Sequence, residues 1–170
     1  IGLIWHEIKH RESISLVKDL DWHTFFFLIG IFILVGTLSQ RGIVDDVANF
    51  IIKHTQGNQF IAFTIIIWLS VILSAFIDNI PYTIAMIPVA KLVAQSLGVG
   101  PELFLFGLLI GTSLGGNITP IGASANVVAV GLLRKHGYHV KFSDFVKIGL
   151  PFTLAAVSVA YIFLWFVWSK

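Results

Sequence analysis

A single carboxylate inside a long apolar run is the feature that most constrains this chain. Between Thr55 and Ala90, Asp78 is the only side chain of the Asp, Glu, Lys, Arg or His type. Runs of this length are typical of membrane proteins, where a carboxylate near mid-depth costs roughly 2.5–3.5 kcal/mol on insertion scales and marks a functional site by default. Asn79, Ile80 and Pro81 predict a helix interruption beside it. At that depth, an interruption is tolerated only where the backbone lines a cavity or is buried in protein.

The composition places the chain among integral membrane proteins. Of its 170 residues, 56% are hydrophobic and 12% are charged, whereas soluble domains carry about 25% charged residues. We therefore expect an all-α integral membrane protein with the lipid bilayer as its main partner. A net charge of +2, with basic residues spread over loops, does not indicate a nucleic-acid partner.

Several other classes are disfavoured. The absence of cysteine excludes disulfide and thiol chemistry. No nucleophile–base pair or metal motif stands out, so we predict no enzyme and no cofactor other than a coupling ion, Na⁺ or H⁺. The chain begins at Ile1 and its single methionine is Met86, so we expect a fragment or a processed product of a longer protein.

The apolar runs and their interruptions predict seven segments. They are a cytoplasmic or interfacial segment (1–21), a transmembrane helix (22–40), an interfacial amphipathic helix (41–59), a re-entrant helical hairpin (60–98), a broken transmembrane helix (101–134), a cytoplasmic loop (135–144) and a transmembrane helix (145–168). Tryptophans at the edges of the first and last spans suit interfacial anchors.

Two of these segments have an alternative. The amphipathic helix at 41–59 would lie on the membrane surface, or its polar face would pack on a neighbouring subunit. The two limbs of 60–98 hold about 38 residues, roughly 57 Å of helix, against the about 30 Å that one crossing needs. We favour a hairpin that enters and leaves on one side over a single kinked span or two full crossings.

The positions of lysine and arginine predict the orientation. If the N-terminal segment and the loop 134–147 share one side, that side holds seven basic residues and the other side holds four: Lys9, Arg11, Lys18, Arg134, Lys135, Lys141 and Lys147 against Arg41, Lys53, Lys91 and Lys170. The positive-inside rule then places the first side in the cytoplasm of a multi-pass cell-membrane protein, with the C-terminus outside. A hairpin that enters and leaves on one side keeps the N-terminal segment and the loop 134–147 on the same side of the membrane. A single kinked span would place them on opposite sides.

Two interrupted apolar segments in succession are the best sequence indication of a transporter binding site. We expect the hairpin tip and the break in the following helix to meet near the midplane. The candidate substrate- or ion-binding residues are Asp78, Asn79, Thr83, Asn117, Thr119, Gly122, Ala123, Ser124 and Asn126. Their oxygen atoms suit Na⁺ or a proton, and we assign a Na⁺ site to Asp78, Asn79, Ser124 and Asn126.

Simpler roles explain the same residues. Asp78 or Asn79 would cap the second limb, since both residue types are preferred N-caps. The glycine-rich break would be a helix-packing surface, and the hydroxyl groups would satisfy freed backbone groups.

Two motifs carry a resemblance to a known family. The segment 74–81, Ser-Ala-Phe-Ile-Asp-Asn-Ile-Pro, and the segment 114–128, which contains Gly-Gly-Asn-Ile-Thr-Pro-Ile-Gly-Ala-Ser-Ala-Asn, resemble the ion transporter superfamily. The arsenite-permease and pink-eyed-dilution (P protein) type is most similar, with citrate/dicarboxylate and sodium–proton antiporter branches further away. Asp78-Asn79 with Thr83 departs from the Ser-Asn-Thr tip of the dicarboxylate branch.

The resemblance implies two inverted repeats, elevator-type movement and a homodimer. This chain matches only the C-terminal repeat, so the N-terminal repeat is missing. Asn79 and the segment 122–126 would form one of two cation or substrate sites. The predicted function is therefore a secondary active transporter for an ion or small anion, coupled to Na⁺ or H⁺. An anion channel on the same fold, a Na⁺/H⁺ antiporter and a non-transporting membrane assembly module are the alternatives.

Overall fold

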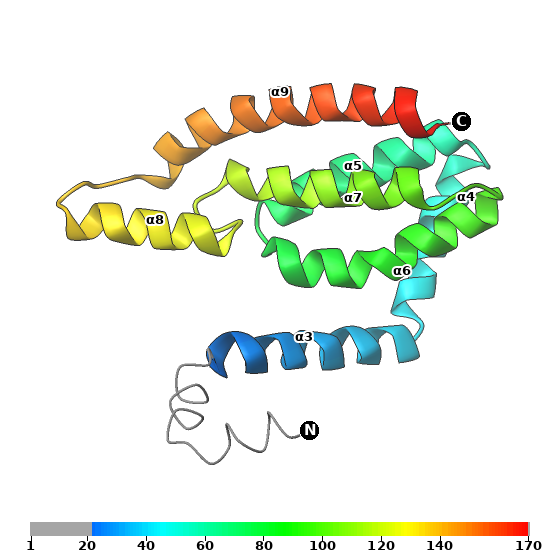
Figure 1. Ribbon diagram of the computed structural model, residues 1–170, viewed down its shortest axis with the longest axis horizontal. Coiled ribbons are helices and arrows are strands. Elements are labelled where there is room, and N and C mark those ends of the chain that lie inside the picture. The colour runs from blue at the N-terminus through cyan, green and yellow to red at the C-terminus, as the bar shows by residue number, and fades with distance from the viewer. Residues whose placement is uncertain (1–21, 170) are drawn as a thin grey trace, which may run out of the picture. The chain divides into compact units, whose positions relative to one another are not determined.

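The computed structural model describes residues 22–169, which form α-helices, one 3₁₀ turn and their connections (Figure 1). The elements are α3 (Trp22–Gln40), α4 (Ile43–Thr55), α5 (Gln59–Ser74), α6 (Asn79–Leu97), α7 (Glu102–Gly115), η1 (Gly116–Ile118), α8 (Ser124–Lys135) and α9 (Phe142–Trp168). No strand occurs in this part of the chain, which confirms the predicted all-α class. The interfacial segment predicted for 1–21 lies outside the described residues.

The chain divides into two compact units after Leu34. In the first unit, the described residues 22–34 are the beginning of α3, an apolar helix with exposed Phe25, Phe26 and Phe32. The second unit, Val35–Lys170, contains all the other helices and the candidate site.

The helices α5 and α6 form a hairpin that reverses at residues 75–78 (Figure 1). The interruption lies earlier than predicted, because Asn79, Ile80 and Pro81 form the first turn of α6 instead of breaking it. Proline is accommodated there since the N–H groups of a first helical turn have no partner within the helix. The α6 helix ends at Gly98, whose φ of 68° is readily adopted by glycine.

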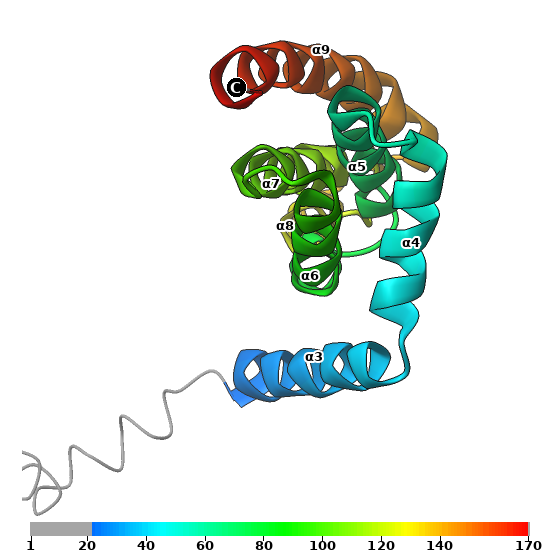
Figure 2. The same cartoon turned by 90° about the vertical axis from the view of Figure 1, so that its right-hand side faces the viewer.

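Close packing of α7 against α5 holds the hairpin in place. A Cβ atom at Gly111 would lie 2.6 Å from the carbonyl oxygen of Ile67, and one at Gly115 would lie 2.5 Å from that of Val71. Glycines four residues apart share one helix face, and small residues on such a face let two backbones approach closely. Because α6 also contacts α7, the three helices form one core (Figure 2).

The apolar stripe of α4 packs on this core. Val44, Ala48 and Ile51 are buried, and α4 contacts α6 more extensively than α5. The acidic Asp45 and Asp46 in the first turn of α4 are exposed. The apolar face of the predicted amphipathic helix is therefore covered by α6 and α5 of the same chain.

The broken span consists of α7, η1 and α8. The α7 helix continues through Gly115, so the break is confined to residues 116–123. The α9 helix then returns along α7 and begins at Phe142 instead of residue 145. The predicted loop 135–144 therefore shrinks to 136–141, because Lys141 O accepts hydrogen bonds from the N–H groups of Asp144 and Phe145.

Two described helices, α6 and α9, are long and apolar enough to cross a membrane by themselves. The pair α3 and α4 is a third candidate if it is one bent span. The start of α5, the end of α6 and the start of α7 lie together, near the end of α9 (Figure 1). The α8–α9 connection lies at the opposite end of the unit.

Candidate functional site

Asp78 is the N-cap of α6. Its Oδ1 atom accepts a hydrogen bond from the backbone N–H of Ile80 at 3.1 Å. This bond satisfies one of the donors that every helix leaves unpaired at its start. The capping role considered for Asp78 is therefore present in the structure, but it uses only one of the two carboxylate oxygens.

The other oxygen of Asp78 contacts the start of α8. Its Oδ2 atom accepts from the backbone N–H of Ser124 at 3.2 Å and from the Ser124 hydroxyl at 2.5 Å. Ser124 is the first residue of α8. One carboxylate thus lies at the N-termini of two helices, α6 and α8, each of which carries the equivalent of roughly half a positive charge.

Two further contacts join the hairpin turn to the break. The Thr119 hydroxyl donates to the carbonyl of Ala75. Gly122 is buried so tightly that a Cβ atom would lie 2.8 Å from Ala75 O and 2.9 Å from Ser74 O. The two interruptions of the apolar sequence therefore touch, through a carboxylate, a hydroxyl and a glycine.

Asn126 shapes the break itself. Its Nδ2 group donates to the carbonyls of Gly116 at 2.9 Å and Thr119 at 3.0 Å. These carbonyls lie at the beginning and in the middle of the break, so the amide group of one α8 residue fixes the path of the backbone before it. The amide nitrogen is directed at these carbonyls and not at Asp78.

A cluster of hydroxyl groups continues from the hairpin into the three-helix core. The Thr83 Oγ1 atom lies 2.6 Å from the carbonyl oxygen of Asn79 and 2.9 Å from Thr112 Oγ1. The Ser74 hydroxyl donates to Thr112 O at 2.6 Å. Hydroxyl groups in this region therefore do satisfy backbone carbonyls. The sequence prediction missed Ser74 and Thr112; their positions in otherwise apolar helices next to the two interruptions were the available signal.

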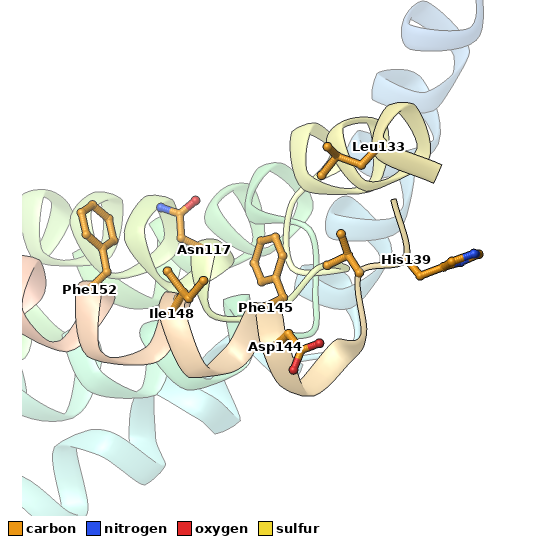
Figure 3. Close-up of a pocket in the computed structure, with 9 residues that line it drawn as sticks. Asn117, Leu133, His139, Asp144, Phe145, Ile148 and Phe152 are labelled. Carbon is orange, nitrogen blue, oxygen red and sulfur yellow. The ribbon is translucent and has the colours of Figure 1, made fainter. Parts of the chain in front are cut away.

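The remaining predicted residues lie around this centre. Ala123 is the N-cap residue of α8 in an extended conformation, and its carbonyl accepts from the backbone N–H of Asn126 at 3.0 Å. Asn117 lies on η1 and lines a separate cavity beside α9 (Figure 3). In the described part of the chain, no hydrogen bond joins Asn117 or the side chain of Asn79 to Asp78.

The residues predicted to form a Na⁺ site have different hydrogen-bond partners in the structure. Asp78 and Ser124 are in contact, whereas the amide nitrogen of Asn126 is engaged by backbone carbonyls. The Asp78 charge is held by N–H and O–H donors. Within residues 22–169, no group of three or more His, Cys, Asp or Glu side chains is arranged to hold a metal ion.

The hairpin and the broken helix consist of apolar helices and meet through one carboxylate. This arrangement defines a segment of a membrane transporter. The chain belongs to the citrate transporter family (CitMHS), whose model matches residues 12–170. This membership confirms the resemblance to the ion transporter superfamily.

Curated relatives agree with this assignment. An uncharacterized transporter of Mycobacterium tuberculosis (strain ATCC 25618 / H37Rv) is 35% identical over 156 residues, which cover 91% of this chain and 36% of the relative. The P protein of Mus musculus is 36% identical over 174 residues, which cover 96% of this chain and 21% of the relative. The chain thus spans about a third of the bacterial relatives that it matches. No solved structure matches it.

Proposed function

We propose that this chain contributes one ion- and substrate-binding half of a secondary active transporter for a small anion, coupled to H⁺ or Na⁺, in which Asp78 is the coupling group. The observation that carries the proposal is the position of the Asp78 carboxylate at the N-termini of both α6 and α8. Half-helix N-termini near the membrane midplane are a recurrent means of binding anionic substrates in transporters.

The charge of Asp78 gives this arrangement a coupling mechanism. When Asp78 is ionised, its carboxylate neutralises the positive ends of α6 and α8, and a second anion is repelled. When a proton or a cation neutralises Asp78, the two helix ends are free to attract an anion. Loading of the coupling ion therefore favours loading of the anion, which is the condition for symport.

The geometry favours a proton over Na⁺. A Na⁺ ion at Asp78 would have to displace the two donors of Ser124 or find room beside them, whereas a proton needs no additional space. The family description, citrate transporter, supports an anionic substrate. Citrate, arsenite and chloride form the panel of test substrates.

The hairpin and the broken helix are expected to move together. Asp78–Ser124, Thr119–Ala75 and the tight packing of Gly122 join the two elements at the site. Such a unit suits elevator-type movement in a homodimer completed by an N-terminal repeat, as the sequence resemblance implies. The site, the coupling ion and the assembly are all parts of this proposal.

Transport by Asp78→Asn tests the proposal. Asparagine is a good N-cap and keeps an oxygen for Ile80 N–H, but it carries no titratable charge. We expect uptake of labelled anion into proteoliposomes, driven by an imposed pH or Na⁺ gradient, to fall to background. The matched control is Asp45→Asn, which neutralises an exposed carboxylate on α4.

The outcomes separate coupling from capping and from other functions. If Asp78→Asn transports at the wild-type rate under a gradient, Asp78 is only a cap and the coupling role is wrong. Anion currents that need no gradient coupling and exceed the turnover of a carrier would favour the channel alternative. Lack of transport by the wild-type protein over the whole substrate panel would favour the assembly module.

A further inference from the structure

A cavity lies apart from the Asp78 site, between the break and the start of α9. It has a volume of about 620 Å³. Phe145, Ile148 and Phe152 lie on one face of α9 and form one wall, and Leu133 at the end of α8 faces them (Figure 3). The wall is predominantly apolar, and its polar members are Asn117 on η1, His139 in the α8–α9 connection and Asp144 in the first turn of α9.

The segment that encloses this cavity is the most basic part of the described chain. Residues 134–147 contain four basic side chains and one acidic side chain, a formal charge of +3: Arg134, Lys135, Lys141 and Lys147 against Asp144. All five are exposed. Lys141 follows the lining residue Val140, and Lys147 precedes the lining residue Ile148, so both lysines are adjacent in sequence to the cavity wall.

We propose that this cavity binds an acyl chain of an anionic phospholipid, whose headgroup is held by the basic side chains of residues 134–147. An apolar wall has no affinity for a small hydrated anion. It does bind an acyl chain, because every methylene group that is removed from water makes the free energy of binding more favourable. Each basic residue next to a membrane helix raises the affinity for an anionic lipid headgroup by about fivefold. The combination fits a molecule with an apolar chain and an anionic head.

The bound lipid would lie against the break of the broken helix. Gly149 of α9 passes η1 so closely that a Cβ atom there would collide with the carbonyl of Asn117, and both residues line the cavity. An occupant of the cavity would therefore contact α9 and η1 at once. Lipid binding at this place does not depend on the transport function of Asp78, because no residue that hydrogen-bonds to Asp78 lines the cavity.

Lipid retention by the purified protein tests the proposal. Native mass spectrometry in detergent would compare phosphatidylglycerol with phosphatidylcholine of the same acyl chains. Ile148→Trp adds bulk inside the cavity, and the control Val159→Trp introduces the same side chain about three turns further along a similar face of α9. Both positions are highly exposed, at 75% and 71% respectively, so neither substitution disturbs a packed core.

Two double variants test how much the lipid headgroup contributes to binding. Lys141→Gln with Lys147→Gln removes two charges beside the cavity, and Lys53→Gln with Lys91→Gln removes two exposed charges on α4 and α6. We expect the first pair to lower the affinity for phosphatidylglycerol by about 30-fold and the second pair to leave it nearly unchanged. Because all four lysines are exposed, this comparison remains valid even if Ile148→Trp impairs folding.

Support for the proposal would be a preference for phosphatidylglycerol that Ile148→Trp and the Lys141/Lys147 pair both weaken, with both controls unaffected. Equal retention of the two lipids would overturn it. Equal retention by Ile148→Trp and Val159→Trp would also overturn it, because the cavity would then contribute nothing to lipid retention.

Discussion

At the level of single residues, Gly122 determines whether the hairpin and the break can meet. Three carbonyl oxygens surround it, those of Gly116, Ala75 and Ser74, and each lies within 3.0 Å of an ideal Cβ atom. These are backbone atoms at the junction of two elements, so they cannot move aside as a flexible side chain would. The hydrogen bonds of Asp78 to Ser124 depend on this close approach.

Gly122→Ala is therefore expected to impair the site. The added methyl group would push the break away from residues 74–75 and lengthen the Asp78–Ser124 contact, with a loss of about 1–3 kcal/mol of unfolding free energy. Gly131→Ala on α8 is the control, because nothing lies within 4 Å of its Cβ position. Thermal unfolding in detergent and gradient-driven uptake provide the readouts. Wild-type uptake by Gly122→Ala would show that the contact is not needed for transport.

The sequence indicated several members of this centre but not which of their atoms make the contacts. Asp78 and Ser124 were both candidates, because a carboxylate and a hydroxyl in interrupted apolar segments indicate a polar site. Asn126 was assigned the role of a ligand, yet its amide nitrogen bonds to the Gly116 and Thr119 carbonyls. Asparagine supplies both a donor and an acceptor, and which of them faces the site depends on the path of residues 116–123.

At the level of helices, the packing of α7 on α5 supports the site. Gly107, Gly111 and Gly115 repeat at intervals of four residues along α7, and each would collide with α5 if it had a Cβ atom. In lipid, where helix association relies on van der Waals contact and not on exclusion of water, such close approach is a principal source of stability.

Gly111→Ala is expected to separate α7 from α5. A Cβ atom would meet the Ile67 carbonyl at 2.6 Å and the Ser70 Cβ atom at 2.9 Å, so we expect unfolding to become easier by about 1–3 kcal/mol. Ser113→Ala, at an exposed position of the same helix, should change the unfolding free energy by less than about 0.5 kcal/mol. Thermal or denaturant unfolding in detergent measures the difference. Equal stability of the two variants would contradict the packing argument.

At the level of the whole molecule, the direction of the hairpin determines which helix ends lie on the same side of the membrane. The ends of α6 and α7 that meet at residues 98–101 lie with the start of α5, and the α8–α9 connection lies at the opposite end (Figure 1). Together with the distribution of basic residues, this arrangement favours a cytoplasmic location for residues 134–147 and an outside location for residues 98–101.

Cysteine labelling tests this orientation, because the chain contains no cysteine of its own. A membrane-impermeant thiol reagent applied to intact cells should label Lys53→Cys and Glu102→Cys, and should label Tyr138→Cys only after permeabilisation. All three positions are exposed. Labelling of Glu102→Cys from the same side as Tyr138→Cys would indicate an additional crossing between residues 53 and 102, and the re-entrant arrangement would then be wrong.

Sequence patterns were sufficient to predict the class of this protein. Its apolar content, its lone carboxylate between Thr55 and Ala90 and its two interrupted segments predicted an all-α membrane transporter, because hydropathy and helix-breaking residues act within a few turns of one helix. The tertiary structure alone decided which groups meet. Asp78 and Ser124 are 46 positions apart, and their contact depends on how closely α5 approaches α7 and on how residues 116–123 are folded. No local pattern encodes such a distance, since it results from packing between segments that are remote in the chain.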